Sequence, residues 1–359
     1  MTHEIAIRCE HVSRDRRTVR IVFERDGRPW LRTFFRSSGP PLRPGGDALL
    51  CLGLLPAVEL GCRLRIDGPV DRGLLAASGR VQRLVAGWAP GCRPVEVRAD
   101  VTDTTYPAGR GHGLFFSCGV DSAYSLAVNR GLVDGLVTIV GADVSLDDRD
   151  RAAWLAGLAR RVAAARGVEA TIIETDLPAV MHPYLGWIEY HGSVLAAIRH
   201  LLADRFATMR VASSADAETE WDAPWGSHPG IDPLLVTAGA VTMLDGAVTR
   251  PLKIARLVEE PDLLASLRVC YHGGPNCGTC CKCVMTRLCL AVLAGGRPVP
   301  SFPPGVPPID RAALAVDDTS VRNDRLSLRD AAAAAGGHDD LVAALDAAVA
   351  DFDHLSSVQ

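Results

Sequence analysis

Four short apolar runs follow Gly113 and constrain the fold more than any other feature of this chain. Each run is followed by a polar or helix-like stretch, and the runs read GLFFS, GLVTIVGAD, VEATIIETD and TMRVASSADAE. Buried strands that alternate with helices are typical of a parallel sheet with helices on both faces. The sequence therefore predicts an α/β fold, with ligands at the carboxyl ends of the strands. The polar residues at those ends are Ser117, Asp143, Thr175 and Ser213.

The composition of the chain changes along its length and divides it into three parts. Residues 1–105 hold short strand-like runs separated by turn residues, with two helix-like stretches, and predict a β-rich N-terminal domain. A polar, glycine-containing stretch then marks a boundary, so residues 106–296 form the predicted α/β domain. Residues 297–359 read as a proline-rich linker and an Ala-rich helical tail, which we expect to pack on the body or to form a homodimer contact.

The overall composition excludes several classes of protein. Hydrophobic residues make up 48% of the 359 residues, charged residues make up 22%, and the net charge is −4. This balance is ordinary for a globular protein and argues against a general nucleic-acid-binding surface, although it leaves room for a local basic groove. We find no run of about 18 apolar residues, so we expect no membrane span. The N-terminus is too charged for a signal peptide, and we expect a cytoplasmic protein.

The stretch FSCGVDS, residues 116–122, joins a predicted strand to a predicted helix. Backbone N–H groups at the start of a helix bind anions, and the helix dipole favours negative charge there. The hydroxyls of Ser117 and Ser122 add donors, and Gly119 lets the backbone approach a ligand closely. Asp121 repels a phosphate unless Mg²⁺ bridges the two, or unless the carboxylate caps amides of the loop. The GK[ST] ending of a Walker A loop is missing, so the sequence predicts a phosphate loop of another type.

Five cysteines crowd into residues 270–283. Four of them have the spacing C-x6-C-x2-C-x2-C, which indicates a metal site rather than disulfides in a chain without an export signal. The predicted ligands of a structural Zn²⁺ are Cys270, Cys277, Cys280 and Cys283. Cys281 is the expected non-ligand, and His272 is an alternative ligand in place of Cys270. A set of free buried thiols is the alternative to a metal site.

These two motifs together resemble the PP-loop, or N-type, ATP pyrophosphatases. The stretch FSCGVDS is similar to their SGGxDS loop, and the cysteine segment resembles that of the 7-cyano-7-deazaguanine synthase family. The matching positions in the cysteine segment are Cys270-Tyr271, Cys277-Gly278, Cys280, Cys283 and Arg287. RPLKIARLVEE, from Arg250, resembles the family's PLxxxxKxE segment with a different lysine spacing. The resemblance covers residues 113–296 and implies an adenine nucleotide alpha hydrolase-like fold that binds ATP, Mg²⁺ and a structural Zn²⁺.

The resemblance also implies roles for individual residues. Pyrophosphate and Mg²⁺ would be held by Ser117, Cys118, Gly119, Val120, Asp121 and Ser122. Ser117 and Asp121, together with Lys253 and Arg250, are the predicted catalytic residues, because cations neutralise phosphate charge in the transition state. Asp143 is a candidate for contact with the adenosine, and His191-Gly192, which we expect to open a helix, for the α-phosphate. Each has a simpler interpretation, as a loop residue, a helix-start residue or, for Lys253, a solvated surface residue.

The resemblance fails where the synthase family binds its base. That family has QTDYSGYPDCR, whereas this chain has SSADAETEWDAPWGSHPGIDPL, and the first hundred residues have no counterpart. We therefore expect a different substrate. The candidate substrate residues, in a tryptophan-containing loop that can form a lid, are Asp216, Trp225, His228 and Asp232. An ordinary structured loop is the alternative.

The predicted function is an ATP-dependent ligase that forms AMP and pyrophosphate. It would activate a carboxylate or amide oxygen of a small molecule for attack by ammonia or another nitrogen nucleophile. One alternative is sulfur insertion into a metabolite or tRNA, which needs a sulfur donor and a reactive cysteine. Another is a zinc-containing nucleotide- or nucleic-acid-binding module without catalysis. We expect Cys118 to replace a glycine with φ below zero, without acting as a nucleophile, and Gly119 to supply the backbone freedom.

Overall fold

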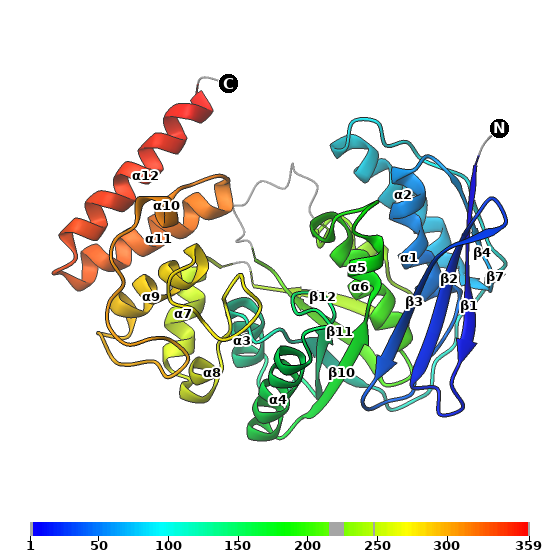
Figure 1. The fold of residues 1–359 in the computed structure, drawn as a ribbon, viewed down its shortest axis with the longest axis horizontal. Helices are drawn as coiled ribbons and strands as arrows, with labels where there is room; N and C mark the ends of the chain where they lie inside the picture. The colour runs from blue at the N-terminus through cyan, green and yellow to red at the C-terminus, as the bar shows by residue number, and fades with distance from the viewer. Residues whose placement is uncertain (1–2, 215–225, 247, 358–359) are drawn as a thin grey trace.

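The computed structural model describes residues 3–214, 226–246 and 248–357 and contains a ten-stranded sheet that extends from the middle of the molecule to the edge where β1 lies (Figure 1). The strand order is β12-β11-β8-β9-β10-β3-β2-β1-β4-β6. The first five strands in this order are parallel and comprise β8 (Gly111–Phe115), β9 (Gly135–Val140), β10 (Glu169–Thr175), β11 (Phe206–Ala212) and β12 (Val241–Asp245). The predicted α/β architecture with a mostly parallel sheet flanked by helices is confirmed.

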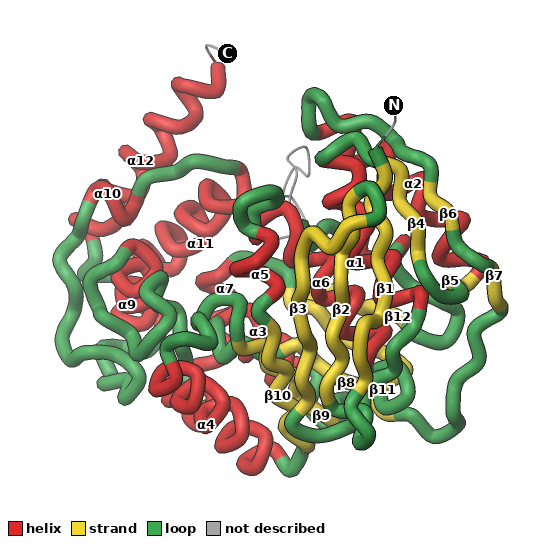
Figure 2. Tube along the Cα trace, turned by 45° about the vertical axis from the view of Figure 1, so that its right-hand side comes forward, coloured by secondary structure: helices red, strands yellow, loops and turns green. Residues whose placement is uncertain are grey.

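The strands of the N-terminal segment extend the same sheet. They are β1 (Glu4–Val12), β2 (Thr18–Arg25), β3 (Arg28–Ser37), β4 (Arg63–Ile66) and β6 (Val97–Arg98). β3 pairs with β10 in antiparallel register, with Glu174 opposite Arg36 and Thr175 opposite Phe35. Figure 2 shows the resulting continuous row of strands. A separate small sheet pairs β5 (Val70–Asp71) with β7 (Val101–Thr102). The segments on the two sides of the predicted boundary at residue 105 therefore share one sheet.

The helices form two layers, one on each face of the sheet. One layer comprises α1 (Gly46–Glu59), α2 (Arg72–Trp88), α5 (Leu177–Met181) and α6 (Trp187–Leu201). The opposite layer comprises α3 (Val120–Val128), α4 (Arg149–Arg166), α7 (Arg250–Val258), α8 (Pro261–Ala265) and α9 (Cys281–Leu293). Successive strand residues enter opposite cores, as Ile172 and Ile173 do, because side chains alternate across a strand. Both faces of the parallel strands are therefore buried, as the apolar runs predict.

The predicted helical tail packs against the second layer. It comprises α10 (Arg311–Leu314), α11 (Thr319–Ala335) and α12 (Asp339–Ser357). Gly336 and Gly337, both at positive φ, separate the last two helices, a conformation that glycine adopts without steric cost. Leu328 of α11 and Leu345 of α12 are fully buried in the core that α7 and α9 also line. The tail thus packs on α7 and α9 of the second layer.

The polar stretch at the predicted boundary is held in place by cation–π contacts and a hydrogen bond of Tyr106. The Tyr106 ring has the guanidinium groups of Arg43 and Arg110 at 4.9 and 4.5 Å from its centroid. Its hydroxyl pairs with the hydroxyl of Thr237. Tyr106 therefore joins the N-terminal segment, the boundary and the segment before β12.

Within the described ranges, no helix combines the length and the apolar composition that crossing a membrane requires.

Candidate functional site

The predicted phosphate loop lies between the end of β8 and the start of α3, as the sequence indicates. The loop folds around its two serines: the Gly119 amide donates to the Ser117 hydroxyl at 3.3 Å, and the Ser122 hydroxyl donates to the Gly119 carbonyl at 3.2 Å. Gly119 is the N-cap of α3 and supplies no side-chain cap. The first turn of α3, with Val120 and Asp121, therefore has the positive end of a helix dipole without a capping side chain.

The backbone conformation of Cys118 differs from the prediction. Its φ is 62°, in the left-handed region, whereas Gly119 is extended with φ −76°. The expectation that Cys118 keeps φ below zero is wrong, and the backbone freedom expected at Gly119 is needed one residue earlier. Among the described residues other than glycine, only Arg16 and Asp26 share a positive φ, and both lie in turns of the antiparallel strands. Cys118 thus occupies a position at which glycine is unstrained.

The Cys118 side chain points into the core rather than toward the loop's open side. It is 1% exposed and packs in the cluster that contains Val120 and Cys270. Burial raises the pKa of the Cys118 thiol to about 12, because a thiolate is poorly solvated there. A neutral thiol is a weak nucleophile, so the structure gives this cysteine a packing role.

Three of the four predicted catalytic residues meet in one ion cluster. Lys253 Nζ donates to Asp121 Oδ1 at 2.8 Å, and Arg250 Nη2 donates to Asp121 Oδ2 at 3.2 Å. Lys253 is completely buried and also donates to the Ser213 carbonyl at 2.7 Å, so it is not a solvated surface lysine. Burial by itself would raise the pKa of Asp121, but Arg250 and Lys253 outweigh it and hold that pKa below its ordinary value. Asp121 is therefore ionised at neutral pH.

Asp324, on α11, joins this cluster and was missed by sequence reasoning. Its Oδ1 accepts a hydrogen bond from the Arg250 backbone N–H at 2.6 Å. Burial raises the pKa of the Asp324 carboxyl. Nothing in the Ala-rich tail distinguishes this aspartate from its neighbours, because its partner lies 74 residues earlier in the chain.

Asp143 lies after the end of β9, as expected, and its carboxylate has a partner that sequence reasoning also missed. Arg268 Nη2 donates to Asp143 Oδ2 at 2.8 Å. The Arg268 side chain is only 5% exposed, whereas that of Asp143 is 54% exposed. The available signal was the place of Arg268 two residues before Cys270, next to the cysteine motif.

His191 and Gly192 do not open a helix, and that expectation is wrong. The N-cap of α6 is Gly186, so His191 lies in the second turn, where its Nδ1 donates to the Ile188 carbonyl at 2.9 Å. Burial lowers the pKa of His191. A Cβ on Gly192 would lie 1.6 Å from the carbonyl oxygen of Gly226. Gly192 therefore serves the close packing of α6 against the segment that starts at Gly226.

Of the candidate substrate residues, Asp216 and Trp225 lie outside the described residues. His228 and Asp232 are 6% and 5% exposed. The Ser227 hydroxyl donates to Asp232 at 2.7 Å, and burial raises the pKa of Asp232 to about 6. The His228 ring lies 4.4 Å from the ring of Trp88, at the end of α2. The N-terminal segment therefore contacts the loop in which we predict substrate binding.

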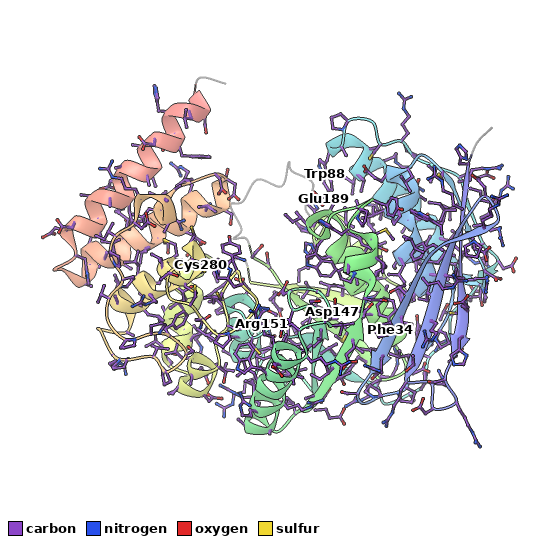
Figure 3. The ribbon with its side chains drawn as sticks, viewed as in Figure 1. Phe34, Trp88, Asp147, Arg151, Glu189 and Cys280 are labelled. Carbon is purple, nitrogen blue, oxygen red and sulfur yellow. The ribbon has the colours of Figure 1, made fainter. Side chains whose placement is uncertain are left out.

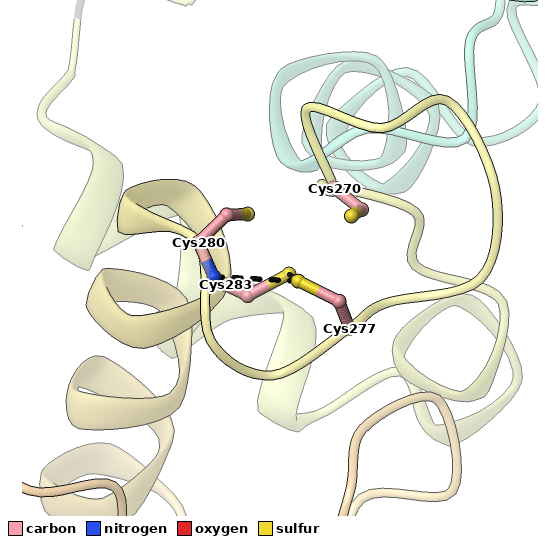
Figure 4. Close-up of side chains that lie close together, drawn as sticks. All are labelled: Cys270, Cys277, Cys280 and Cys283. Atoms are coloured by element: carbon pink, nitrogen blue, oxygen red, sulfur yellow. Dashed lines mark hydrogen bonds between the residues drawn. The ribbon is translucent and has the colours of Figure 1, made fainter.

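The four predicted zinc ligands converge in space (Figure 4). Their sulfur atoms all lie within 4.8 Å of one another, and Cys281, which is exposed, is not in the group. His272 is likewise not in the group that the described residues form. The set Cys270, Cys277, Cys280 and Cys283 can therefore hold a zinc ion, and its four sulfur donors suit a closed tetrahedral site.

Hydrogen bonds stabilise the thiolate form of Cys277. Cys277 Sγ accepts from the Thr279 hydroxyl at 3.4 Å and from the Cys280 backbone N–H at 3.3 Å. The Thr279 hydroxyl, followed by the backbone amides, lowers the pKa of Cys277 to about 5. Arg287, a residue of the matching motif, donates to the Gly278 carbonyl at 2.9 Å and so closes the turn between Cys277 and Cys280. These contacts fit a metal-thiolate site.

Comparison of the chain with protein-family models, with curated proteins and with solved structures found no match.

Proposed function

We propose that the protein is an ATP-dependent adenylating enzyme with an adenine nucleotide alpha hydrolase-like fold, which releases AMP and pyrophosphate. The observation that supports this most is the ion cluster beside the serine loop. Arg250 and Lys253 of α7 bring two positive charges to the Asp121 carboxylate in the first turn of α3, and Arg250 also pairs with Asp324. An uncapped helix N-terminus with two cations beside it favours a polyphosphate.

The proposed roles follow from the chemistry of phosphoryl groups. The Ser117 hydroxyl and the first amides of α3 would donate hydrogen bonds to phosphate oxygens, Ser122 would shape the loop through its bond to the Gly119 carbonyl, and Asp121 would hold Mg²⁺. The magnesium ion would supply charge neutralisation at the departing pyrophosphate. Because Lys253 is buried and fixed by two acceptors, its charge is positioned before the reaction rather than recruited during it. Such prearranged charge is what lowers the barrier of a step that develops negative charge.

We propose a nitrogen nucleophile, ammonia or an amine, that attacks the adenylated carboxylate or amide of a small molecule. Sulfur insertion would need a thiolate close to the nucleotide. Cys118, the cysteine within the loop, is buried and neutral, with a pKa of about 12. This favours nitrogen over sulfur insertion into a metabolite or tRNA. Zn²⁺ in the four-cysteine site would be structural.

The test is product analysis with ATP and Mg²⁺ as the probe. Zinc-loaded protein is incubated with ATP and a panel of small carboxylates and ammonium, and nucleotide products are separated. AMP and pyrophosphate in equal amounts are expected, and Asp121→Asn should lower their formation at least a hundredfold. Asp262→Asn is the matched control, since Asp262 pairs with an arginine, Arg166, outside this cluster. ADP as the stoichiometric product, or full activity of Asp121→Asn, would refute adenylation at this site.

A further inference from the structure

The chain segment that leads into the cysteine cluster lies directly against the phosphate loop. The backbone N–H of Arg268 donates to the carbonyl of Cys118 at 2.8 Å. Its guanidinium Nη2 donates to Asp143 at 2.8 Å. A single residue, two positions before the first predicted zinc ligand, therefore contacts the loops that follow both β8 and β9.

The loop after Cys270 makes two more contacts, one with α4 and one with the loop that follows β9. Arg151 of α4, labelled in Figure 3 together with Cys280, donates through Nη1 to the carbonyl of His272 at 2.8 Å. Gly273 has φ 74°, and a Cβ there would lie 2.8 Å from the Asp143 carbonyl oxygen. The cysteine segment is therefore packed closely against the loop after β9 and against α4.

The contact at Cys118 matters because that residue is strained. A left-handed φ of 62° is unfavourable for any residue with a Cβ, and it persists only where the surroundings fix it. The Arg268 N–H group fixes the Cys118 carbonyl from one side, and burial fixes the side chain from the other. The next residues, Gly119 and Val120, start the helix that would bind phosphate.

The position of Arg268 depends in turn on the folded cysteine segment. Asn276 closes the turn, because its Oδ1 accepts from the Val269 N–H and its Nδ2 donates to the Leu267 carbonyl. After these hydrogen bonds of Asn276, the remaining constraint on the segment is the convergence of its four cysteine sulfurs. Zinc binding by such a segment contributes folding free energy directly.

We propose that the four-cysteine segment is a wall of the nucleotide site and that Arg268 is the positioning residue that links it to the phosphate loop. Loss of the metal then loosens residues 116–124 and weakens ATP binding. The inference rests on the proposed function only in naming ATP as the ligand. The linkage itself is a property of the segment and the loop.

The experiment measures amide hydrogen exchange of the full zinc-loaded chain by mass spectrometry, together with the Kd for Mg-ATP. A zinc chelator should speed the exchange of residues 116–124 at least tenfold while β9 and β10 stay protected. Arg268→Met keeps the backbone N–H group but loses the guanidinium contact with Asp143, which holds that N–H group against Cys118. With zinc bound, this variant should therefore speed exchange of residues 116–124 and 141–144 and raise the Kd at least tenfold. Arg268→Lys, which keeps a charge for Asp143, should restore the Kd to within threefold of the original.

Arg166→Met is the matched control. Arg166 is similarly buried, at 8% exposure, and pairs with Glu260 and Asp262 in the same layer. The proposal is overturned if chelation frees only residues 270–283, or if Arg268→Met behaves like Arg166→Met. If chelation unfolds the whole chain, the exchange rates and Kd values of the zinc-loaded Arg268 variants decide whether the segment and the loop are linked. If the unmodified protein does not bind ATP, the proposed function fails, while the exchange of residues 116–124 still decides the linkage.

Discussion

Replacing Cys118 by glycine and by alanine measures the backbone strain at the start of the phosphate loop. Both variants lose the buried sulfur atom, so their difference isolates the Cβ and the backbone. Glycine relieves a left-handed strain of about 1–2 kcal/mol, since φ is 62°. Two effects act against glycine: the greater entropy of its unfolded chain lowers the free energy of unfolding by about 0.4–1 kcal/mol, and the loss of a buried carbon lowers it by about 0.8 kcal/mol. These opposing contributions nearly cancel, so Cys118→Gly and Cys118→Ala should unfold within about 0.5 kcal/mol of each other.

The matched control is Ala123→Gly, five residues later within α3. Ala123 is also buried, at 1% exposure, but it has a helical backbone. There glycine loses about 1 kcal/mol of helix propensity and about 0.8 kcal/mol of buried carbon, with no strain to relieve. The assay is denaturant unfolding of zinc-loaded protein. The difference in unfolding free energy between the glycine and alanine chains should be smaller at position 118 than at position 123. If the two differences are equal, Cys118 is not left-handed and the reasoning fails.

Activity of the same variants tests whether the thiol takes part in chemistry. A buried neutral thiol has no role in the reaction, so Cys118→Gly should keep turnover within about tenfold, a cost below about 1.4 kcal/mol. Iodoacetamide should modify the exposed Cys281 of the native protein and spare Cys118. If Cys118→Gly binds ATP normally but forms product orders of magnitude more slowly, sulfur transfer should replace the nitrogen mechanism.

Three further predictions follow from the ion cluster, the metal site and the buried aspartate. Lys253→Met leaves the Asp121 carboxylate without its ammonium partner and should lower the free energy of unfolding by about 3 kcal/mol. Adding Asp121→Asn to the same chain should recover part of this loss. Equal losses in the single and the double variant would contradict the pairing. Cys280→Ser should purify with little zinc by elemental analysis, whereas Cys281→Ser keeps it, and zinc-free unmodified protein would refute the site. Because burial raises the pKa of Asp232 to about 6, its protonation favours the folded state, and this contribution is full below about pH 4 and lost as the pH rises through 6. Asp232→Asn should remove that part of the pH dependence in unfolding measured between pH 4 and 7, and an unchanged profile would show that another group causes it.

Much of the fold was predictable because it depends on local patterns. The apolar runs after Gly113 form β8, β9, β10 and β11, since a strand buried on both faces needs apolar residues at nearly every position. The cysteine spacing predicted which four sulfurs converge, because short steps between ligands leave few ways to surround a metal. The substrate stretch was less informative: it lacks the pattern of the family that the chain resembles, and Asp216 and Trp225 lie outside the described residues.

The sequence by itself determined that the chain has a parallel sheet, a serine loop at a helix start and a cluster of four cysteines. These depend on residues close together in the chain. Only the tertiary structure decided that β3 continues the sheet beside β10, that Asp324 and Arg268 join the site, and that Cys118 takes the left-handed conformation. Each of these depends on a partner far away in the chain, as between Cys118 and Arg268, and a contact between distant residues leaves no periodic signal in the sequence.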